Sequence, residues 1–165
     1  METIAVYWEP KIRIYGLTRQ VGLSLYSVLF PAGRLAYWGG RIRDLAANGR
    51  DFELVNLQTV SAETLQFCLL LAGVDNEALV RRLLEDGLAH EDATSLQTIA
   101  PVALIYLHGP HFQDRYGIAE AALSPMQKAD IPVLAAGCSG TSVYIVVPED
   151  RLDVAATCLA ETFVI

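Results

Sequence analysis

The sequence has few charged residues, and this shortage excludes two classes of protein. Asp, Glu, Lys and Arg make up 19% of the 165 residues, whereas 53% are hydrophobic. A disordered chain needs the opposite balance, so we expect a folded protein with a large buried surface. Lysine and arginine total 12 against 19 acidic residues, which gives a formal net charge of -7. A nucleic-acid groove needs clustered cations, so no nucleic-acid partner is expected.

Cysteine is scarce as well, and no targeting segment is apparent. The three cysteines, Cys68, Cys138 and Cys158, form no C-x-x-C pair. An odd and scattered set argues against a disulfide framework and predicts buried, reduced thiols in a cytoplasmic protein. The first residues lack the basic and apolar regions of a signal peptide. The longest apolar runs are shorter than the ~20 residues that span a bilayer, so no membrane association is expected.

Motifs that carry chemistry are also missing. The sequence has no G-x-x-x-x-G-K-[ST] loop and no G-x-G-x-x-G after a strand. Cys138 lies at a hairpin with no evident base beside it. His108 and His111 share a strand-to-loop segment, where local hydrogen bonding is commoner than metal binding. Asp114 and Glu120 resemble surface charges beside a helix start more than an acid-base pair. We therefore expect no catalysis, no cofactor and no metal.

The second half of the chain shows a regular order of elements. Val102–His108 is rich in strand-forming residues, and a polar turn leads to a helical segment over 118–130. Two short apolar runs, 132–137 and 141–147, flank a hairpin signal at Ser139–Gly140. A final helix is predicted by apolar residues at helical spacing, which are Leu152, Ala155, Ala156, Leu159 and Phe163. The order is βαββα, one strand short of a βαββαβ unit.

The first half contains a complete βαββαβ order. Its predicted elements are strands 21–30, 52–60, 64–71 and 94–99, a helix from Leu35 that stops at Asn48–Gly49, and a helix from Asp75 or Asn76 to Gly87. Gly39 and Gly40 fall inside the first helix, where each costs roughly 1 kcal/mol relative to alanine. Either a close contact between helix and sheet or a break in the helix would account for them.

One predicted strand, 11–17, has no place in the first unit, while the second unit lacks its last strand. Because an unpaired sheet edge is unfavourable, we expect 11–17 to complete the second unit. The prediction is an α+β protein with two ferredoxin-like βαββαβ units in tandem, each an antiparallel sheet with helices on one face. The first unit, 20–100, would be inserted in the second, which comprises 10–18 and 101–165.

Two such units in tandem resemble a pair of ACT domains, and in particular the regulatory region of aspartate kinases. The pattern is carried by Leu107–Gly109 with Asp114–Ile118, by Ile131–Asp150, and by the closing helix at 155–163. The first unit matches the family pattern less well. The positions that do match are chiefly Gly33, Asn56–Gln58 and the helix after Asp75. Three features depart from the family pattern: Pro125 lies inside an expected helix, the loop 30–34 has no acidic residue, and the kinase half is absent.

The residues and the resemblance together predict a ligand site. In each unit a glycine-containing loop opens a helix, whose free N–H groups and partial positive charge suit a carboxylate. The resemblance implies an amino-acid effector between these loops and the neighbouring second strand, across a subunit interface. The candidate ligand-binding residues are Gly33, Arg34, Asn56 and Gln58 in the first unit, and His111, Gln113, Asp114, Arg115 and Gly117 in the second.

The predicted function is a non-enzymatic regulator of amino-acid metabolism. It would bind an amino acid and form a homodimer. A separate, aspartate-kinase-like catalytic chain would be a further partner. Three alternatives stay open at this point. The loops can be ordinary turns of a unit that has lost its ligand. The chain can be a ligand-free dimerisation or assembly module, or a small regulatory subunit for an aspartate-kinase-like enzyme. It can also be a small enzyme on the same fold.

Overall fold

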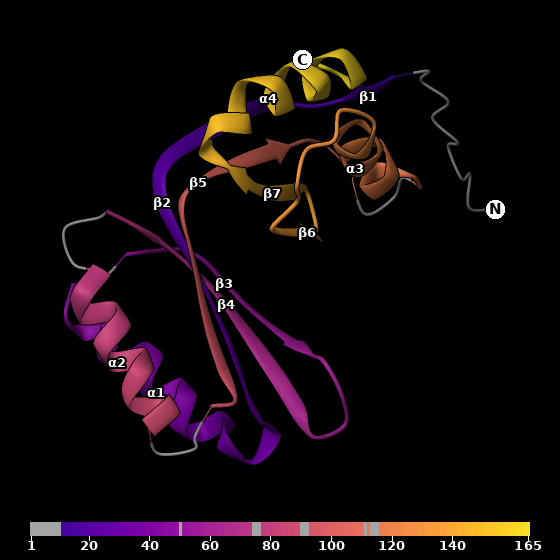
Figure 1. The fold of residues 1–165 in the computed structure, drawn as a ribbon. Coiled ribbons are helices and arrows are strands. Elements are labelled where there is room, and N and C mark those ends of the chain that lie inside the picture. Colours follow the sequence, from indigo (N-terminus) through magenta and orange to yellow (C-terminus); the bar gives the residue numbers. More distant parts are fainter. Residues whose placement is uncertain (1–10, 50, 74–76, 90–92, 111, 113–115) are drawn as a thin grey trace. The chain divides into compact units, whose positions relative to one another are not determined.

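The computed structural model describes residues 11–49, 51–73, 77–89, 93–110, 112 and 116–165. The chain divides into two compact units. We name Gln20–Ala103 the central unit, and Met1–Arg19 with Leu104–Ile165 the terminal unit. Two long strands, β2 (Gly16–Pro31) and β5 (Ser95–His108), contribute residues to both units (Figure 1).

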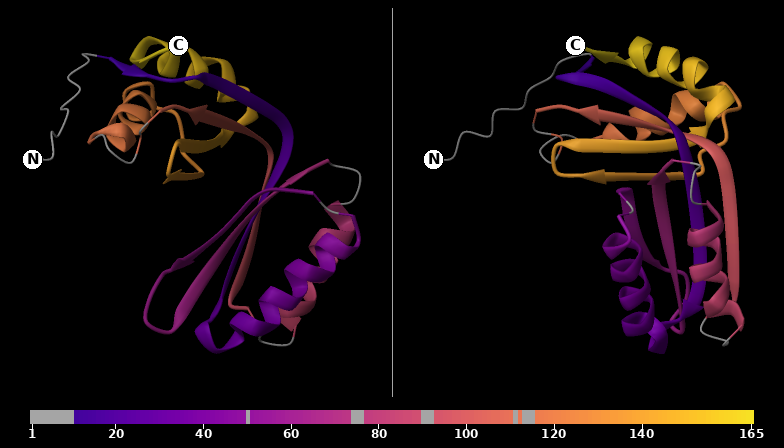
Figure 2. Two further views of the ribbon diagram at one scale, coloured as in Figure 1. Left: turned by 180° about the vertical axis from the view of Figure 1, so that it is seen from behind. Right: turned by 90° about the vertical axis from the view of Figure 1, so that its left-hand side faces the viewer.

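The central unit has hydrogen-bonded strands in the order β3-β4-β2-β5. Its remaining elements are η1 (Ala32–Arg34), α1 (Leu35–Ala47), β3 (Phe52–Thr59), β4 (Thr64–Ala72) and α2 (Glu77–Ala89). Strand β4 pairs antiparallel with both β2 and β3. The helices α1 and α2 lie side by side on one face of these strands (Figure 2).

The core of the central unit lies between this sheet and its helices. Alternate residues of β2 and β4 face the helices, as in the opposed pairs Tyr26↔Leu69 and Val28↔Phe67. Trp38 of α1 is completely buried in the same cluster. The intervening residues of each strand point to the helix-free face, so that face carries a different set of side chains.

The terminal unit repeats the combination of helices and sheet with other residues. Its hydrogen-bonded strands follow the order β2-β5-β7-β6. Its other elements are α3 (Ile118–Lys128), β6 (Ala135–Ser139), β7 (Ser142–Pro148), η3 (Glu149–Arg151) and α4 (Leu152–Thr162). A separate parallel pair joins β1 (Ile12–Arg13) to β8 (Phe163–Val164). The backbone N–H of Tyr15 donates to the carbonyl oxygen of His108 over 2.7 Å.

Helices α3 and α4 pack against each other, and α4 also packs against β7 of the terminal sheet. Small side chains permit this approach, because Ala122, Ala155 and Ala156 are completely buried. Four of the α4 residues predicted to form an apolar face are buried as expected: Leu152, Ala155, Ala156 and Leu159. Among the described residues, no helix is long and apolar enough to cross a membrane.

The sequence pattern separates strand 11–17 from 21–30 and strand 94–99 from 102–108, but the structure has a continuous strand across each of these gaps. The polar residues 18–20 lie within β2, where the Thr18 hydroxyl donates to the carbonyl oxygen of Tyr106 over 3.5 Å. Polar side chains on exposed positions are compatible with a strand, so their polarity marks no turn. Likewise Pro101 does not end a strand, since β5 continues through a cis Ala100–Pro101 bond.

Neither explanation offered for Gly39 and Gly40 holds. Helix α1 runs unbroken through both residues. A Cβ atom added at either glycine would meet nothing within 4 Å, so no close helix-sheet contact requires them. Helix α2 extends beyond its predicted end at Gly87 to Ala89, whereas α3 begins at Ile118 as predicted, continues through Pro125 and ends at Lys128. Of the cysteines, only Cys68 is buried, while Cys138 is exposed.

Candidate functional site

The first candidate loop joins β2 to α1 in the central unit. A 3-10 turn, Ala32–Arg34, precedes the helix, and no side chain caps its start. The N–H of Ala32 donates to the carbonyl oxygen of Glu63 over 2.8 Å, which ties the loop to the β3–β4 hairpin. Gly33 has open space where a side chain would stand. Neither the 3-10 turn nor the first turn of α1 holds an acidic residue, so this segment itself supplies no carboxylate to the positive end of the helix.

Asn56 and Gln58 do not lie beside this loop in one copy of the chain. They belong to β3, and β4 separates β3 from β2. Two strand spacings correspond to about 10 Å. The prediction that these amides occupy the strand adjacent to the loop is therefore wrong within a single chain. Their sequence positions alone could not reveal it, because the strand order determines it.

The amides form part of a polar row on the helix-free face of the central sheet. Gln58 donates from Nε2 to Oε1 of Gln66, and Gln66 donates from Nε2 to the hydroxyl of Ser27. The three residues come from three neighbouring strands, β3, β4 and β2. Hydrogen bonds to Gln66 fix the amide of Gln58, so its oxygen is held in one orientation. Sequence reasoning missed Gln66 and Ser27, since only the register brings them together.

Cys68 lies directly opposite Asn56 and two residues along β4 from Gln66. Burial raises the pKa of the Cys68 thiol, and a hydrogen bond with Ser27 opposes this rise in part. A buried thiol with a raised pKa is mostly protonated at neutral pH, which makes it a poor nucleophile. This environment supports a structural rather than a reactive cysteine.

The second candidate loop precedes α3 in the terminal unit. Gly117 is the residue before the helix and has φ 83°, a left-handed conformation that glycine adopts without strain. Glu120 lies in the first turn of α3, and its Oε2 would lie 4.0 Å from a Cβ atom at Gly117. This carboxylate already occupies the vicinity of the helix N-terminus. The other candidates of this loop, His111, Gln113, Asp114 and Arg115, lie outside the described residues.

His108 belongs to a hydroxyl and aromatic cluster on β5 and β7. The Tyr106 hydroxyl donates to Ser142 Oγ over 2.7 Å, and Ser142 Oγ lies 3.1 Å from His108 Nδ1. The rings of His108 and Tyr15 lie 5.5 Å apart. Local hydrogen bonding thus accounts for this histidine. Within the part of the chain that the structure describes, no three His, Cys, Asp or Glu side chains cluster as metal ligands would.

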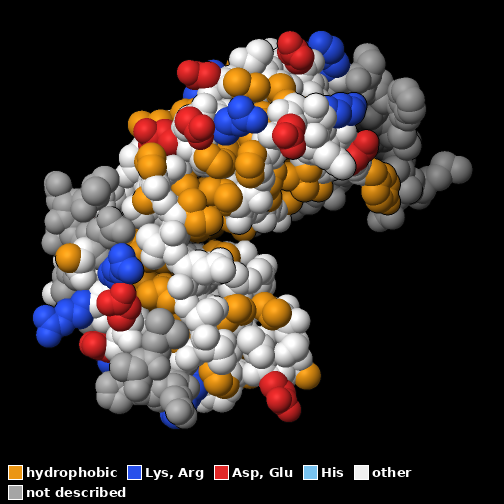
Figure 3. Space-filling view, in the orientation of Figure 1, with side chains coloured by type: hydrophobic (Ala, Val, Ile, Leu, Met, Phe, Trp, Pro, Cys, Tyr) orange, Lys and Arg blue, Asp and Glu red, His pale blue; other side chains and the backbone are white. Residues whose placement is uncertain are grey.

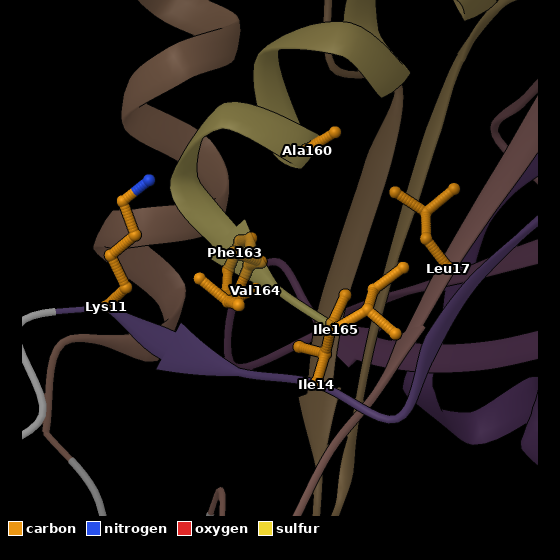
Figure 4. Close-up of a pocket in the computed structure, with 7 residues that line it drawn as sticks. All are labelled: Lys11, Ile14, Leu17, Ala160, Phe163, Val164 and Ile165. Carbon is orange, nitrogen blue, oxygen red and sulfur yellow. The ribbon is translucent and has the colours of Figure 1, made fainter.

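A hollow opens in the terminal unit between β1, β8 and the end of α4 (Figure 4). Its volume is about 340 Å³. The lining side chains are Lys11, Ile14, Leu17, Ala160, Phe163, Val164 and Ile165. One of these seven is charged, and the others are apolar. Elsewhere on the terminal unit, the surface visible in Figure 3 has acidic and basic side chains interspersed with apolar ones.

No protein-family model matches this sequence, and no curated protein matches it. Among solved structures, the regulatory subunit of aspartate kinase from Thermus thermophilus, in its ligand-free form, has a TM-score of 0.75 at 10% identity. The match covers 90% of this chain and 97% of that one. A structure of aspartokinase alpha and beta subunits gives a TM-score of 0.76 at 12% identity, covering 90% and 97%.

A longer kinase matches as well. Aspartokinase III of E. coli, in complex with lysine and aspartate, has a TM-score of 0.63 at 18% identity. That match covers 94% of this chain and 34% of the kinase chain. The chain thus spans nearly all of the two shorter chains and about a third of the kinase. In fold, this chain resembles the regulatory region of aspartate kinases, as the sequence pattern predicts.

Proposed function

We propose that this chain is a non-catalytic regulatory module that binds a free amino acid and controls a separate kinase-like chain. The observation that carries the proposal is the fold likeness to a regulatory subunit of aspartate kinase over nearly the full length of both chains. The likeness to aspartokinase alpha and beta subunits supports a catalytic partner chain. The lysine and aspartate bound to the E. coli kinase support an amino acid as the ligand class.

The strand orders support two βαββαβ units, one inserted in the other. In the central unit, the order β3-β4-β2-β5 equals 2-3-1-4 in chain order. In the terminal unit, β5, β6 and β7 provide the first three strands and the start of β2 provides the fourth. The order β2-β5-β7-β6 is then 4-1-3-2, which is the same order read in reverse. Both agree with a ferredoxin-like arrangement.

The proposed site uses the loop before α1 of one copy and β3 of a second copy. The helix N-terminus at Gly33 and Arg34 suits the α-carboxylate, because the first turn of the helix contains no acidic side chain that would compete for it. The amide oxygens of Asn56 and Gln58 suit the ammonium group. Since β4 separates the two sets in one chain, a homodimer that places β3 beside a partner's loop would unite them. Strand β3 is an edge strand with exposed Val55 and Leu57, which favours such pairing.

The loop before α3 is the weaker of the two carboxylate sites, since Glu120 stands near that helix start. Gly117 and the four neighbouring candidates, His111, Gln113, Asp114 and Arg115, remain predicted ligand residues for the second unit. A ligand there would have to displace the Glu120 side chain or bind through its ammonium group.

Calorimetric titration with each of the twenty amino acids tests the proposal. We expect saturable binding of at least one. The variant Ala36→Glu places a carboxylate in the first turn of α1 and should weaken binding roughly fivefold by charge repulsion. Ala119→Glu makes the same change in the first turn of α3 and serves as the matched control. Weakening by Ala119→Glu alone would move the site to the second loop, and no binding of any amino acid would refute the sensor.

A second candidate is a ligand-free assembly subunit. The observation that favours it is a departure from the family pattern: many effector-binding ACT loops carry an acidic residue, whereas the loop before α1 has Arg34 as its charged residue. An assembly subunit would bind its partner with the same affinity with or without amino acids. Sedimentation of the pure protein and capture of an aspartate-kinase-like chain from the native cell, each with and without the amino-acid mixture, distinguish the two functions.

A further inference from the structure

The hollow of the terminal unit has a cation, Lys11, and an otherwise apolar lining. None of its lining residues belongs to the proposed amino-acid site. Figure 4 shows Lys11 at one end of the group and Leu17 at the other, with Ala160 and Ile14 on opposite sides between them. An elongated ligand with one anionic end would therefore meet a cation at one end and aliphatic surface along the rest.

The walls of the hollow are fixed by backbone pairing. The N–H of Ile14 donates to the carbonyl oxygen of Val164 over 2.7 Å, and β1 pairs in parallel with β8. Ile14 and Phe163 are each only 3% exposed, so these two side chains are held by the surrounding core. The volume of about 340 Å³ lies at the lower end of the range for small-molecule sites.

The lining also discriminates among anions. Among the described lining residues there is no Asp or Glu, nor any other side chain that could accept a hydrogen bond from an ammonium group. The ammonium group of a zwitterionic amino acid would find none of these side chains as an acceptor and would be repelled by the Lys11 cation. A carboxylate without an amine has no such cost, and its alkyl chain would cover Leu17, Val164 and Ile165.

We propose that this hollow binds an aliphatic monocarboxylate, with the carboxylate at Lys11 and the alkyl chain along Leu17, Val164 and Ile165. The site is distinct from the proposed amino-acid site and does not depend on it. Ala160 makes room for the chain, because it is the smallest side chain of the lining and belongs to the last turns of α4.

Titration of the ¹⁵N-labelled full chain with octanoate tests this site. We expect saturable amide shifts at Ile14, Leu17, Ala160 and Val164. Octylamine, which has the same chain and the opposite charge, should give no saturable shift, and leucine should leave these four amides unchanged. Equal binding of octanoate and octylamine, or octanoate shifts that stay linear and spread over the molecule, would overturn the proposal.

Variants assign the binding to the hollow. Lys11→Met should weaken octanoate roughly fivefold, as the loss of one exposed ion pair does. Lys128→Met removes the same charge from α3, outside the hollow, and should leave the affinity unchanged. Ala160→Trp fills the hollow from an exposed position and should abolish the saturable shifts. Equal effects of the two lysine variants, or full binding by Ala160→Trp, would refute the site. Amino-acid binding is read separately at Gly33 and Ala36, so either proposal can fail alone.

Discussion

The central and terminal units combine helices and sheet in the same way but fill their cores differently. The central core is built on aromatic rings, with Phe30 5.7 Å from Trp38 and 5.2 Å from Phe67 between ring centroids. The terminal core brings two helices together through completely buried alanines, among them Ala155 and Ala156. One unit therefore depends on a few large side chains, and the other on close approach of backbones.

The same contrast continues at the helix starts. Neither helix start has a side-chain cap, but the first turn of α3 contains Glu120 and the first turn of α1 contains no acidic residue. The first turn of α3 therefore compensates the partial positive charge of its helix, and the first turn of α1 does not. Two helix starts of a shared fold therefore differ in their electrostatic environment, and this difference supports the proposal of a carboxylate site in the central unit.

The largest expected effect comes from removing the buried indole ring of Trp38. Trp38→Ala should lower the free energy of unfolding by about 3–5 kcal/mol, because it deletes a fully buried indole and leaves a cavity. Urea denaturation followed by circular dichroism measures this loss. Tyr116→Ala, at a fully exposed tyrosine, should change stability by less than about 0.5 kcal/mol. A loss below about 1 kcal/mol for Trp38→Ala would contradict an aromatic-anchored core.

Two glycines should respond in opposite directions. A Cβ atom at Gly109, in the terminal unit, would clash with the Phe112 ring and lie 3.1 Å from the carbonyl oxygen of Arg13. Gly109→Ala should therefore cost about 1–3 kcal/mol. Gly39 of α1 has open space, and Gly39→Ala should stabilise the chain by up to about 1 kcal/mol. Thermal unfolding of both variants checks the signs, and a destabilising Gly39→Ala would reveal a contact that α1 makes with another chain.

Neutralising the acid at the start of α3 should give a smaller change. Glu120→Gln should lower the free energy of unfolding by about 0.3–1 kcal/mol, because the helix loses its favourable charge. The reverse change, Ala36→Glu in α1, should raise it by a similar amount. Both effects should diminish in 1 M salt, where the Debye length is about 3 Å. Equal and opposite shifts in urea midpoints would support the contrast, and no shift in either would remove it.

Much of this fold could be predicted from local patterns. The spacing of Leu35, Trp38, Ile42 and Leu45 predicted α1, because a helix buries every third or fourth residue. The Ser139–Gly140 signal likewise predicted the β6–β7 hairpin. Polar residues and proline were less reliable as signals of where a strand ends. Strand pairing overrode the polarity of 18–20 and the proline at 101, since exposed strand positions accept both kinds of residue.

The candidate site could be predicted only in part. Gly33 and Arg34 are at a helix start, as their loop indicated. Asn56 and Gln58 were correctly placed on a strand, but their separation from that loop depends on strand order, which no local pattern encodes. Gln66, the partner of Gln58, and Ser27, the partner of Gln66, come from other strands for the same reason. Side chains joined by register are the contacts that sequence reading misses.

The smallest effect concerns Cys68 and is absent at neutral pH. Burial raises the pKa of this thiol above the value of an exposed cysteine, while Cys138 is exposed. Because the native pKa is raised, the stability that the neutral thiol contributes is fully present below the unfolded pKa. It is lost as the pH rises through the native value. Urea midpoints measured from pH 7 to 10 should fall more steeply for the native chain than for Cys68→Ala, which has no thiol to ionise at this position. Identical slopes would show that burial does not disfavour the Cys68 thiolate.

Alkylation at pH 8 gives an independent check within the same chain: Cys138 should react first, and Cys68 only under unfolding conditions.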